Sequence, residues 1–169
     1  ESVNEVDVGA QASGKITKLY AKLGQEIKKG EIIADIDSTT QINTLNTKKA
    51  ALVSYQAQLK AKKTAYDVAL SSYNRLSKLY TQKATSLDSL NTAKSTLDNA
   101  KAEMEAIEAN IKQAEIEVNT AETNVGYTKI TAPMDGTVIS VPVSEGQTVN
   151  ANQTTPTIVT DRKSTRLNS

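Results

Sequence analysis

The sequence contains a β-type motif twice, and a long helical segment separates the two copies. The first copy is GKITKLYAKLGQEI (residues 14–27), and the second is GTVISVPVSEGQTV (residues 136–149). In both copies the two glycines lie ten positions apart, and Gln-x-(Ile/Val) follows the second glycine. The offset between the copies is 122 residues throughout. A repeat that is split in this way predicts one small β-domain assembled from both chain ends, with the inserted segment as a rod.

The regions around the two copies have the pattern of short strands. In the first half, residues 6–37, Gly24 and Gly30 mark turns, and residues 31–37 form a good strand candidate. In the second half, residues 127–160, a strand over 128–131 is followed by turn signals from Pro133 to Gly136 and a strand over 137–141.

The inserted segment, residues 38–126, has no Pro, and Gly126 is its only Gly. It predicts two helices, about 39–80 and 86–124, because apolar residues recur every seven positions on each. On the first helix the repeat is Leu45, Leu52, Leu59, Tyr66, Tyr73 and Tyr80. On the second there are two repeats: Leu90, Leu97, Met104, Ile111, Val118 and Val125, and Ala93, Ala100, Ile107, Ala114 and Ala121. A break near residues 82–84 makes the pair an antiparallel hairpin.

The helix starts also have sequence signals. Ser38 with Gln41 three residues later predicts a capping box at the first start, and Thr85 or Ser86 with Asp88 marks the second. If the turn centres on Lys83, facing residues have numbers that add up to about 166. Large side chains then face small ones in the pairs Leu45–Ala121, Leu52–Ala114, Tyr66–Ala100 and Tyr73–Ala93, with Leu59–Ile107 as the exception.

The two predicted helices carry opposite charge. Seven basic residues against Asp67 give the first a net charge of +6, and eight acidic residues against three lysines give the second −5. Opposite charges attract within a hairpin, and they also attract between neighbouring copies. Two interpretations stay open: the charges form an ordinary solvated surface, or hairpins pack side by side in a ring.

Composition excludes several functions. The net charge is only +1 and aromatic residues make up 4%, which argues against a nucleic-acid surface. The absence of His and Cys removes the usual zinc ligands and the common nucleophile–base pairs, so we expect no metal, no cofactor and no enzyme. No apolar run is long enough to span a membrane, and no signal-peptide pattern occurs at Glu1, so any anchor would lie outside this sequence.

The split motif resembles the periplasmic adaptor family, also called membrane fusion proteins. The resemblance rests on residues 6–159, above all on Thr131-Ala132-Pro133 followed by Asp135-Gly136, and the stretches VDVGAQ (6–11) and YTKITAP (127–133) are similar to the MacA type. It implies an α+β fold in which a lipoyl-like β-sandwich or barrel is interrupted by an α-helical coiled-coil hairpin. A lipoyl or biotin carrier is the weaker alternative, because no Lys occurs where the helices are inserted.

The resemblance also implies site residues. Arg75, Leu79 and Ser86 match the tip pattern with which the family engages an outer-membrane channel. The alternative is structural: Leu79 ends the core, Arg75 is a solvated charge and Ser86 is a helix cap. The loop with Glu145 and Gln147 matches a channel-facing loop of the family, or is an ordinary β-turn in which Gly146 supplies a positive φ. Asp35 and Asp37 are interpreted as solvated residues at a strand end.

The function implied is that of a periplasmic adaptor of a tripartite efflux or secretion pump. It would bridge an inner-membrane transporter of the ABC type to a TolC-type outer-membrane channel through its hairpin tip, and it would form part of the conduit wall. By resemblance, copies would assemble as a ring, a hexamer. The protein would lie in the periplasm, associated with the inner membrane in its full-length form. The alternatives are a type I secretion or RND-pump adaptor, a Gram-positive relative without an outer-membrane partner, and a structural coiled-coil module. Residues 161–169 do not resemble the family's continuation and are interpreted as a cloning-derived or disordered tail.

Overall fold

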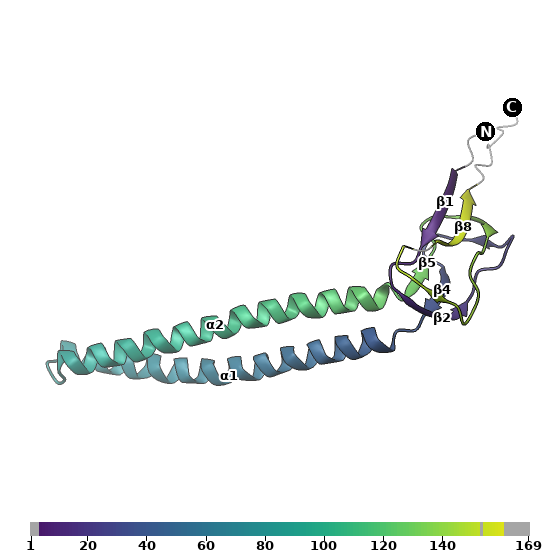
Figure 1. Cartoon of the computed structure of the whole chain (residues 1–169). Helices are drawn as coiled ribbons and strands as arrows, with labels where there is room; N and C mark the ends of the chain where they lie inside the picture. Colours follow the sequence, from purple (N-terminus) through teal and green to yellow (C-terminus); the bar gives the residue numbers. More distant parts are fainter. Residues whose placement is uncertain (1–3, 153, 161–169) are drawn as a thin grey trace, which may run out of the picture. The chain divides into compact units, whose positions relative to one another are not determined.

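The computed structural model describes residues 4–152 and 154–160, and it divides into two compact units (Figure 1). The β unit combines the chain up to Thr44 with the chain from Ala121 onward, and the hairpin unit runs from Leu45 to Thr120. The expected tail, residues 161–169, lies outside the described residues. Within the described part of the chain, neither long helix is apolar enough to cross a membrane.

The β unit consists of two four-stranded antiparallel sheets. The first half supplies β1 (Asn4–Gly9), β2 (Gly14–Leu19), β3 (Glu26–Ile27) and β4 (Ile32–Ile36). The second half supplies β5 (Lys129–Thr131), β6 (Gly136–Ser140), β7 (Thr148–Val149) and β8 (Thr154–Thr160). The strand orders are β1-β8-β6-β3 and β5-β4-β2-β7, so each sheet takes two strands from each end of the chain. The predicted assembly of one β-domain from both ends is therefore confirmed.

The offset of 122 residues extends to the whole β unit. Adding 122 to the residue numbers of β2, β3 and β4 gives the positions of β6, β7 and β8. The pairing of β2 with β4 corresponds in the same way to the pairing of β6 with β8. The core repeats in the same way, because buried residues occur in pairs with this offset. The pairs are Val8–Ile130, Ala10–Ala132, Ile16–Val138, Ala21–Val143, Ile27–Val149 and Ile33–Thr155.

The turns of the two halves match as well. Gly24 and Gly146 both have a left-handed φ, of 81° and 84°, and each donates its N–H to the central strand of the other half. The side-chain oxygens of Gln25 and Gln147 accept hydrogen bonds from the N–H groups of Lys22 and Ser144, three residues earlier in each turn. The Gly-Gln pair of the repeat is thus a turn device that the fold uses twice.

A second matched pair of bonds ties the halves to each other. The Asp135 carboxylate accepts a hydrogen bond of 2.6 Å from the Lys29 N–H, and the Ser13 hydroxyl accepts one of 2.9 Å from the Ala151 N–H. Ser13 and Asp135 each precede the glycine that opens a central strand, and Lys29 and Ala151 occupy equivalent turns. Each half therefore satisfies a free backbone donor of the other half.

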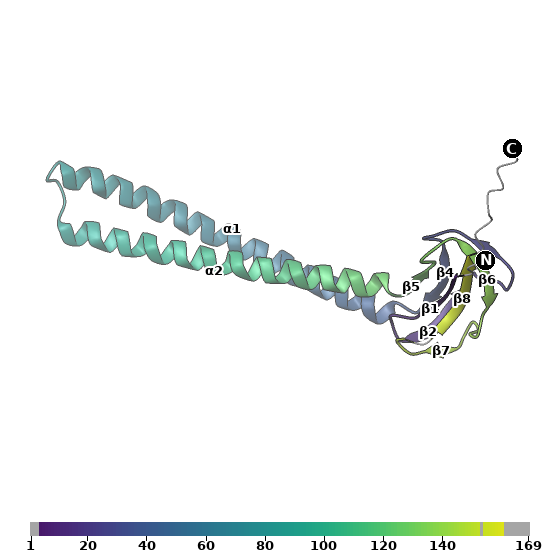
Figure 2. The ribbon, with the colours of Figure 1, turned by 90° about the horizontal axis from the view of Figure 1, so that it is seen from above.

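The hairpin is formed by α1 (Thr39–Thr81) and α2 (Leu87–Gly126), which run antiparallel (Figure 2). Within the hairpin unit, the less exposed residues of α2 follow both predicted seven-residue repeats. On α1 the structure adds a second repeat that apolar periodicity missed: Lys48, Tyr55, Lys62, Ala69 and Leu76. Lys48 and Lys62 occupy seam positions and pair with Glu117 and Glu103 at 3.1 and 2.9 Å. Both pairs have numbers that add up to 165, one less than predicted.

The start of α1 differs from the prediction of a capping box. The side-chain oxygen Oε1 of Gln41 is buried and has no hydrogen-bond partner, so it does not close a box with Ser38. Instead, Oδ1 of Asp37 accepts hydrogen bonds from the N–H and the hydroxyl of Thr39, at 3.0 and 2.8 Å. The prediction was wrong because a carboxylate one residue before Ser38 binds a different free backbone donor, the Thr39 N–H, and carries the negative charge that a helix N-terminus favours.

The end of α1 is closed by a backbone motif. Ala84 donates its N–H to the carbonyl of Leu79, and Lys83 donates to that of Tyr80, while Lys83 has a φ of 58°. This is the Schellman arrangement, in which the residue after the helix adopts a left-handed conformation. Tyr80, predicted as the last member of the α1 repeat, is 41% exposed, and Leu79 is more buried. The repeat therefore shifts by one residue where the helix ends.

Candidate functional site: the hairpin tip

The tip is the end of the hairpin unit, residues 75–89. Arg75 and Leu79 lie one helical turn apart on α1, so both side chains fall on one face. Arg75 is exposed, whereas Leu79 is half-buried. A cation beside a partly covered apolar side chain offers a partner both a charged donor group and a small apolar contact. Whether a channel binds there stays a prediction.

Ser86 has a defined structural role at the tip. Its hydroxyl oxygen accepts a hydrogen bond from the Ser89 N–H at 3.1 Å, and it lies 2.9 Å from the Ser89 hydroxyl. Because α2 begins at Leu87, Ser86 is the N-cap of this helix. Asp88, in the first turn, adds negative charge where the helix dipole favours it. The predicted cap is confirmed, and any contact of Ser86 with a partner would add to this role.

The tip is basic and its charges are not paired with each other. Arg75, Lys78 and Lys83 are exposed, against one carboxylate, Asp88. Over residues 4–152 and 154–160, the salt bridges within 4.0 Å are those of Lys48 and Lys62, and neither lies at the tip. The tip thus presents net positive charge to whatever approaches it.

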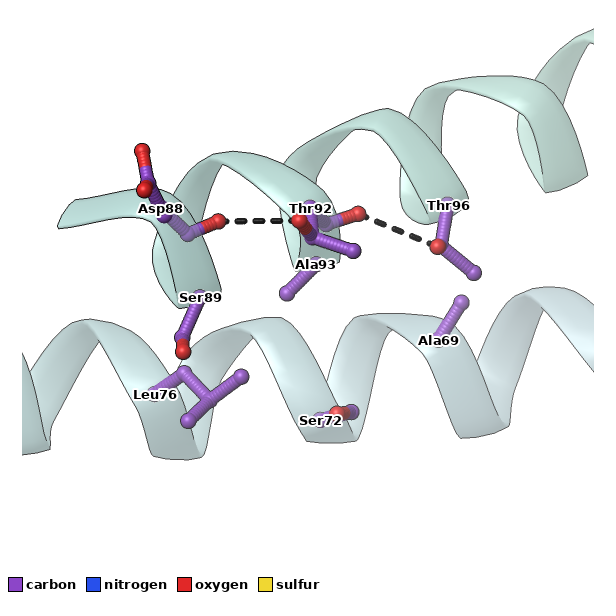
Figure 3. A pocket seen from close by; sticks show the side chains of 8 residues that line it. All are labelled: Ala69, Ser72, Leu76, Asp88, Ser89, Thr92, Ala93 and Thr96. Atoms are coloured by element: carbon purple, nitrogen blue, oxygen red, sulfur yellow. Dashed lines mark hydrogen bonds between the residues drawn. The ribbon is translucent and has the colours of Figure 1, made fainter. Parts of the chain in front are cut away.

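A shallow groove of about 420 Å³ lies between α1 and α2 beside the tip (Figure 3). Six of its eight lining residues have short side chains, namely Ala69, Ser72, Ser89, Thr92, Ala93 and Thr96; the others are Leu76 and Asp88. The hydroxyls of Thr92 and Thr96 donate to the helix carbonyls of Asp88 and Thr92, at 2.9 and 3.0 Å. Short side chains and hydroxyls bonded within the helix leave the two helices incompletely packed here.

The loop with Glu145 and Gln147 is a β-turn, closed by a bond of 3.1 Å from the Gln147 N–H to the Ser144 carbonyl, with Gly146 supplying the positive φ. Both predicted residues are exposed, yet one side-chain oxygen of each accepts a local backbone bond. Glu145 accepts from the Leu19 N–H at 3.0 Å, and Gln147 accepts from Ser144. The turn is therefore explained structurally, and its channel-facing role stays a prediction.

Asp35 and Asp37 border a small pocket, and one carboxylate oxygen of each accepts local hydrogen bonds, while the other oxygen of Asp35, Oδ1, is buried without a partner among the described residues. Asp35 accepts a hydrogen bond of 2.9 Å from the Tyr20 hydroxyl, and this bond raises the pKa of Tyr20 above its ordinary value. The bonds from Thr39 lower the pKa of Asp37. In the described part of the chain no group of three acidic residues could hold a metal ion. The hydrogen bonds of Asp35 and Asp37 therefore give both carboxylates a structural role in the β unit.

These features define a class of protein: a β-sandwich of two matched halves, interrupted by an antiparallel helical hairpin. Residues 4–161 match the family model described as the RND membrane fusion protein (MFP) barrel-sandwich hybrid domain. The chain belongs to the membrane fusion protein family, as the split motif and the Thr-Ala-Pro run predicted. This is a family of adaptors and not of enzymes.

Named relatives agree with this assignment. The pyoverdine export membrane fusion protein PvdR of Pseudomonas aeruginosa is 44% identical over 154 residues, which cover 91% of this chain and 39% of PvdR. The macrolide export protein MacA of Escherichia coli O157:H7 is 34% identical over 160 residues, which cover 95% of this chain and 43% of MacA. The chain thus spans about two fifths of the length of these relatives.

Solved structures place the chain near MacA. The crystal structure of MacA from Actinobacillus actinomycetemcomitans is 78% identical, with a TM-score of 0.83, and the match covers 94% of this chain and 50% of that one. A MacA–MexA chimeric protein that contains the MexA α-hairpin domain is 45% identical, with a TM-score of 0.53, over 94% of this chain and 46% of that one. The predicted similarity to the MacA type is confirmed.

Proposed function

We propose that this chain is part of a periplasmic adaptor that bridges an inner-membrane transporter, of the ABC type, to a TolC-type outer-membrane channel. The observation that carries the proposal is the family match over residues 4–161, together with 78% identity to a MacA structure. The relatives are named for macrolide and pyoverdine export, which supports a role in export. We place the adaptor in the periplasm, associated with the inner membrane.

The tip would dock the channel through Arg75, Leu79 and Ser86. Arg75 can donate several hydrogen bonds in a fixed planar geometry, and it has no salt bridge within 4.0 Å among the described residues. Leu79 would add a small apolar contact one turn further along the same face. Ser86 would offer its hydroxyl while it caps α2. The tip would therefore bind by a few polar contacts around one apolar side chain.

Copies of the chain would assemble as a ring, as a hexamer, in which the hairpins form the conduit wall. The opposite net charges of the two helices support lateral packing, because the basic helix of one copy can face the acidic helix of the next. In this ring the turn with Glu145 and Gln147 would face the passage. Its local hydrogen bonds would hold the turn rigid rather than leave it free to gate.

A second candidate is an adaptor that serves an RND transporter, because the matching family model carries that description. The identity to MacA favours the first candidate over this one. The two differ in energy source, since an ABC transporter hydrolyses ATP. Stimulation of ATP hydrolysis by a full-length adaptor carrying this chain would support the first candidate, and no stimulation of any ABC partner would favour the second.

Docking is tested by replacing Arg75 with Ala in a full-length adaptor that contains this chain, followed by an efflux complementation assay. We expect efflux to fall, because the variant loses the charged donor group without changing the seam of the hairpin. Lys94→Ala, an exposed cation on α2 beyond the tip, is the matched control and should retain efflux. Unchanged efflux in the Arg75 variant would count against docking through the tip.

A further inference from the structure

Lys83 departs from the pattern that the other left-handed residues of this chain follow. In the described residues, a φ in the left-handed region occurs at Gly24, Gly30, Lys83, Gly146 and Asn152. Glycine adopts this conformation without a Cβ penalty, and asparagine tolerates it because its short side chain bonds locally. Lysine has neither advantage. The chain therefore places an unfavourable residue type at the apex of its hairpin, where glycine would fit the same backbone.

The turn itself does not require the lysine side chain. The two bonds that close α1 are donated by the backbone N–H groups of Lys83 and Ala84. Within the described residues, the Lys83 side chain is exposed and forms no salt bridge within 4.0 Å. A cation near a helix C-terminus interacts favourably with the helix dipole, but Lys78 already supplies a cation in the last turn of α1. What the side chain adds is a mobile positive charge at the outermost turn.

The end of α1 sets the left-handed conformation at position 83 but does not require a lysine there, and residues with a strained backbone concentrate at functional sites. The ammonium group of Lys83 adds to the uncompensated positive charge of Arg75 and Lys78. A positive tip attracts a partner that carries carboxylates. The ammonium group of a lysine, at the end of a flexible four-carbon stem, can reach carboxylates in several positions around an opening. Charges at the rim of an interface act mainly on partner choice and on the rate of association.

We propose that Lys83 is a specificity-determining residue of the tip, which selects an outer-membrane channel whose periplasmic mouth carries carboxylate groups. This inference rests on the proposed function. Arg75 and Leu79 would supply the docking contacts, and Lys83 would pair with acidic side chains at the rim of the opening.

The test measures binding of a purified TolC-type channel in detergent to the chain, which is immobilised at high density so that several tips engage one channel. The variants are Lys83→Asn, which keeps a residue suited to a left-handed φ but removes the charge, Lys83→Gly, and Lys83→Arg, which keeps the charge. We expect Lys83→Asn and Lys83→Gly to weaken binding roughly three- to tenfold and to reduce its dependence on salt. Lys83→Arg should remain within about twofold of the parent chain.

Thermal unfolding of the same variants separates recognition from a structural role. We expect Lys83→Gly and Lys83→Asn to melt at the same temperature as the parent chain or higher, because both relieve the strained backbone. Lys94→Gln removes an exposed cation of α2 that lies outside the tip and is the matched charge control; it should bind nearly as the parent does. Lower stability that parallels weaker binding would overturn the inference in favour of a structural role.

Other results would also overturn it. Normal binding by Lys83→Asn, or an equal loss in Lys94→Gln, would show that Lys83 has no selective role. If Arg75→Ala loses binding while Lys83→Asn retains it, the inference fails and the proposed function stands. If the parent chain binds anionic phosphatidylglycerol vesicles and not the channel, both the inference and docking through the tip are wrong.

Discussion

Asp37 shows how one side chain joins the β unit to a helix start. Its carboxylate accepts two hydrogen bonds from Thr39, and Lys15 adds a smaller favourable charge, so its pKa lies below the ordinary value of 3.8. A lowered pKa in the folded state stabilises the fold above the unfolded pKa, and this contribution is lost as the pH falls through the folded pKa. The start of α1 should therefore fray only in acid.

The prediction is checked by following the carboxyl carbon of Asp37 by NMR as the pH is lowered. We expect a midpoint below 3.8, and we expect the Thr39 amide to lose protection over the same range. Asp37→Asn keeps an acceptor and removes the titration, so its Thr39 amide should show no such change. A midpoint at or above 3.8 would refute the assigned cap.

Asp135 tests the tie between the two halves. Asp135→Ala removes the acceptor of the Lys29 N–H, so hydrogen exchange of this amide should accelerate roughly fivefold, which corresponds to about 1 kcal/mol. Asp135→Asn retains an acceptor and should exchange more slowly than the Ala variant. If the exchange of Lys29 is the same in Asp135→Ala and the parent chain, this bond does not hold the halves together.

Single-residue roles were the hardest to predict from sequence. Ser86 was predicted as a cap because a hydroxyl before a helical repeat is a strong local signal. Asp37, Asp135 and Glu145 were not predicted in their roles, because each accepts a bond from a backbone N–H whose position the fold alone sets. Two of those donors lie more than 100 residues away, where no local pattern reports them.

At the scale of the element, the hairpin depends on a seam that is only partly apolar. Leu97 lies on the α2 repeat and is half-buried, so Leu97→Asp would place an unpaired charge between the helices. We expect the hairpin to lose about 2 kcal/mol of stability, measured by thermal unfolding at 222 nm. Asn99→Asp adds the same charge at an exposed position of α2 and should melt nearly as the parent does.

Equal melting of the two variants would show that Leu97 does not lie on the seam. The composition of the seam also explains which of its repeats could be predicted from the sequence. Both α2 repeats are apolar throughout, whereas the second α1 repeat holds Lys48 and Lys62, which an apolar search rejects. These lysines bury part of their aliphatic stems and keep their charged ends on Glu117 and Glu103. Their partial exposure limits each pair to a small contribution to stability.

For the whole molecule, the matched halves mean that neither end of the chain can form the β unit alone. Each sheet combines two strands from each end of the chain, and every second-half strand pairs with a strand of the first half. A chain in which a short Gly-Ser linker replaces residues 45–120 should retain the β unit, whereas a chain ending at Gly126 should not. Dispersed amide resonances in the first and their absence in the second would bear this out.

Dispersed β-strand amide resonances in the chain ending at Gly126 would mean that the first half of the β unit folds independently. Sequence predicted the two-ended β unit because the glycine and glutamine positions of the turns survive in both halves. It did not show how far the repeat extends, because equivalent core positions hold residues of different size and polarity, such as Ile33 and Thr155. Burial is retained where identity and size are not, and the buried Thr155 hydroxyl donates to the Val8 carbonyl.

The account depends most on the tip being the end that meets the channel. A photo-crosslinking amino acid at Leu79, in a full-length adaptor expressed with a TolC-type channel, tests this directly. The matched control carries the same group at Gln113, an exposed position in the middle of α2. We predict a crosslink to the channel from position 79 and none from position 113. A crosslink to the channel from position 113 alone, or from neither position, would contradict the account.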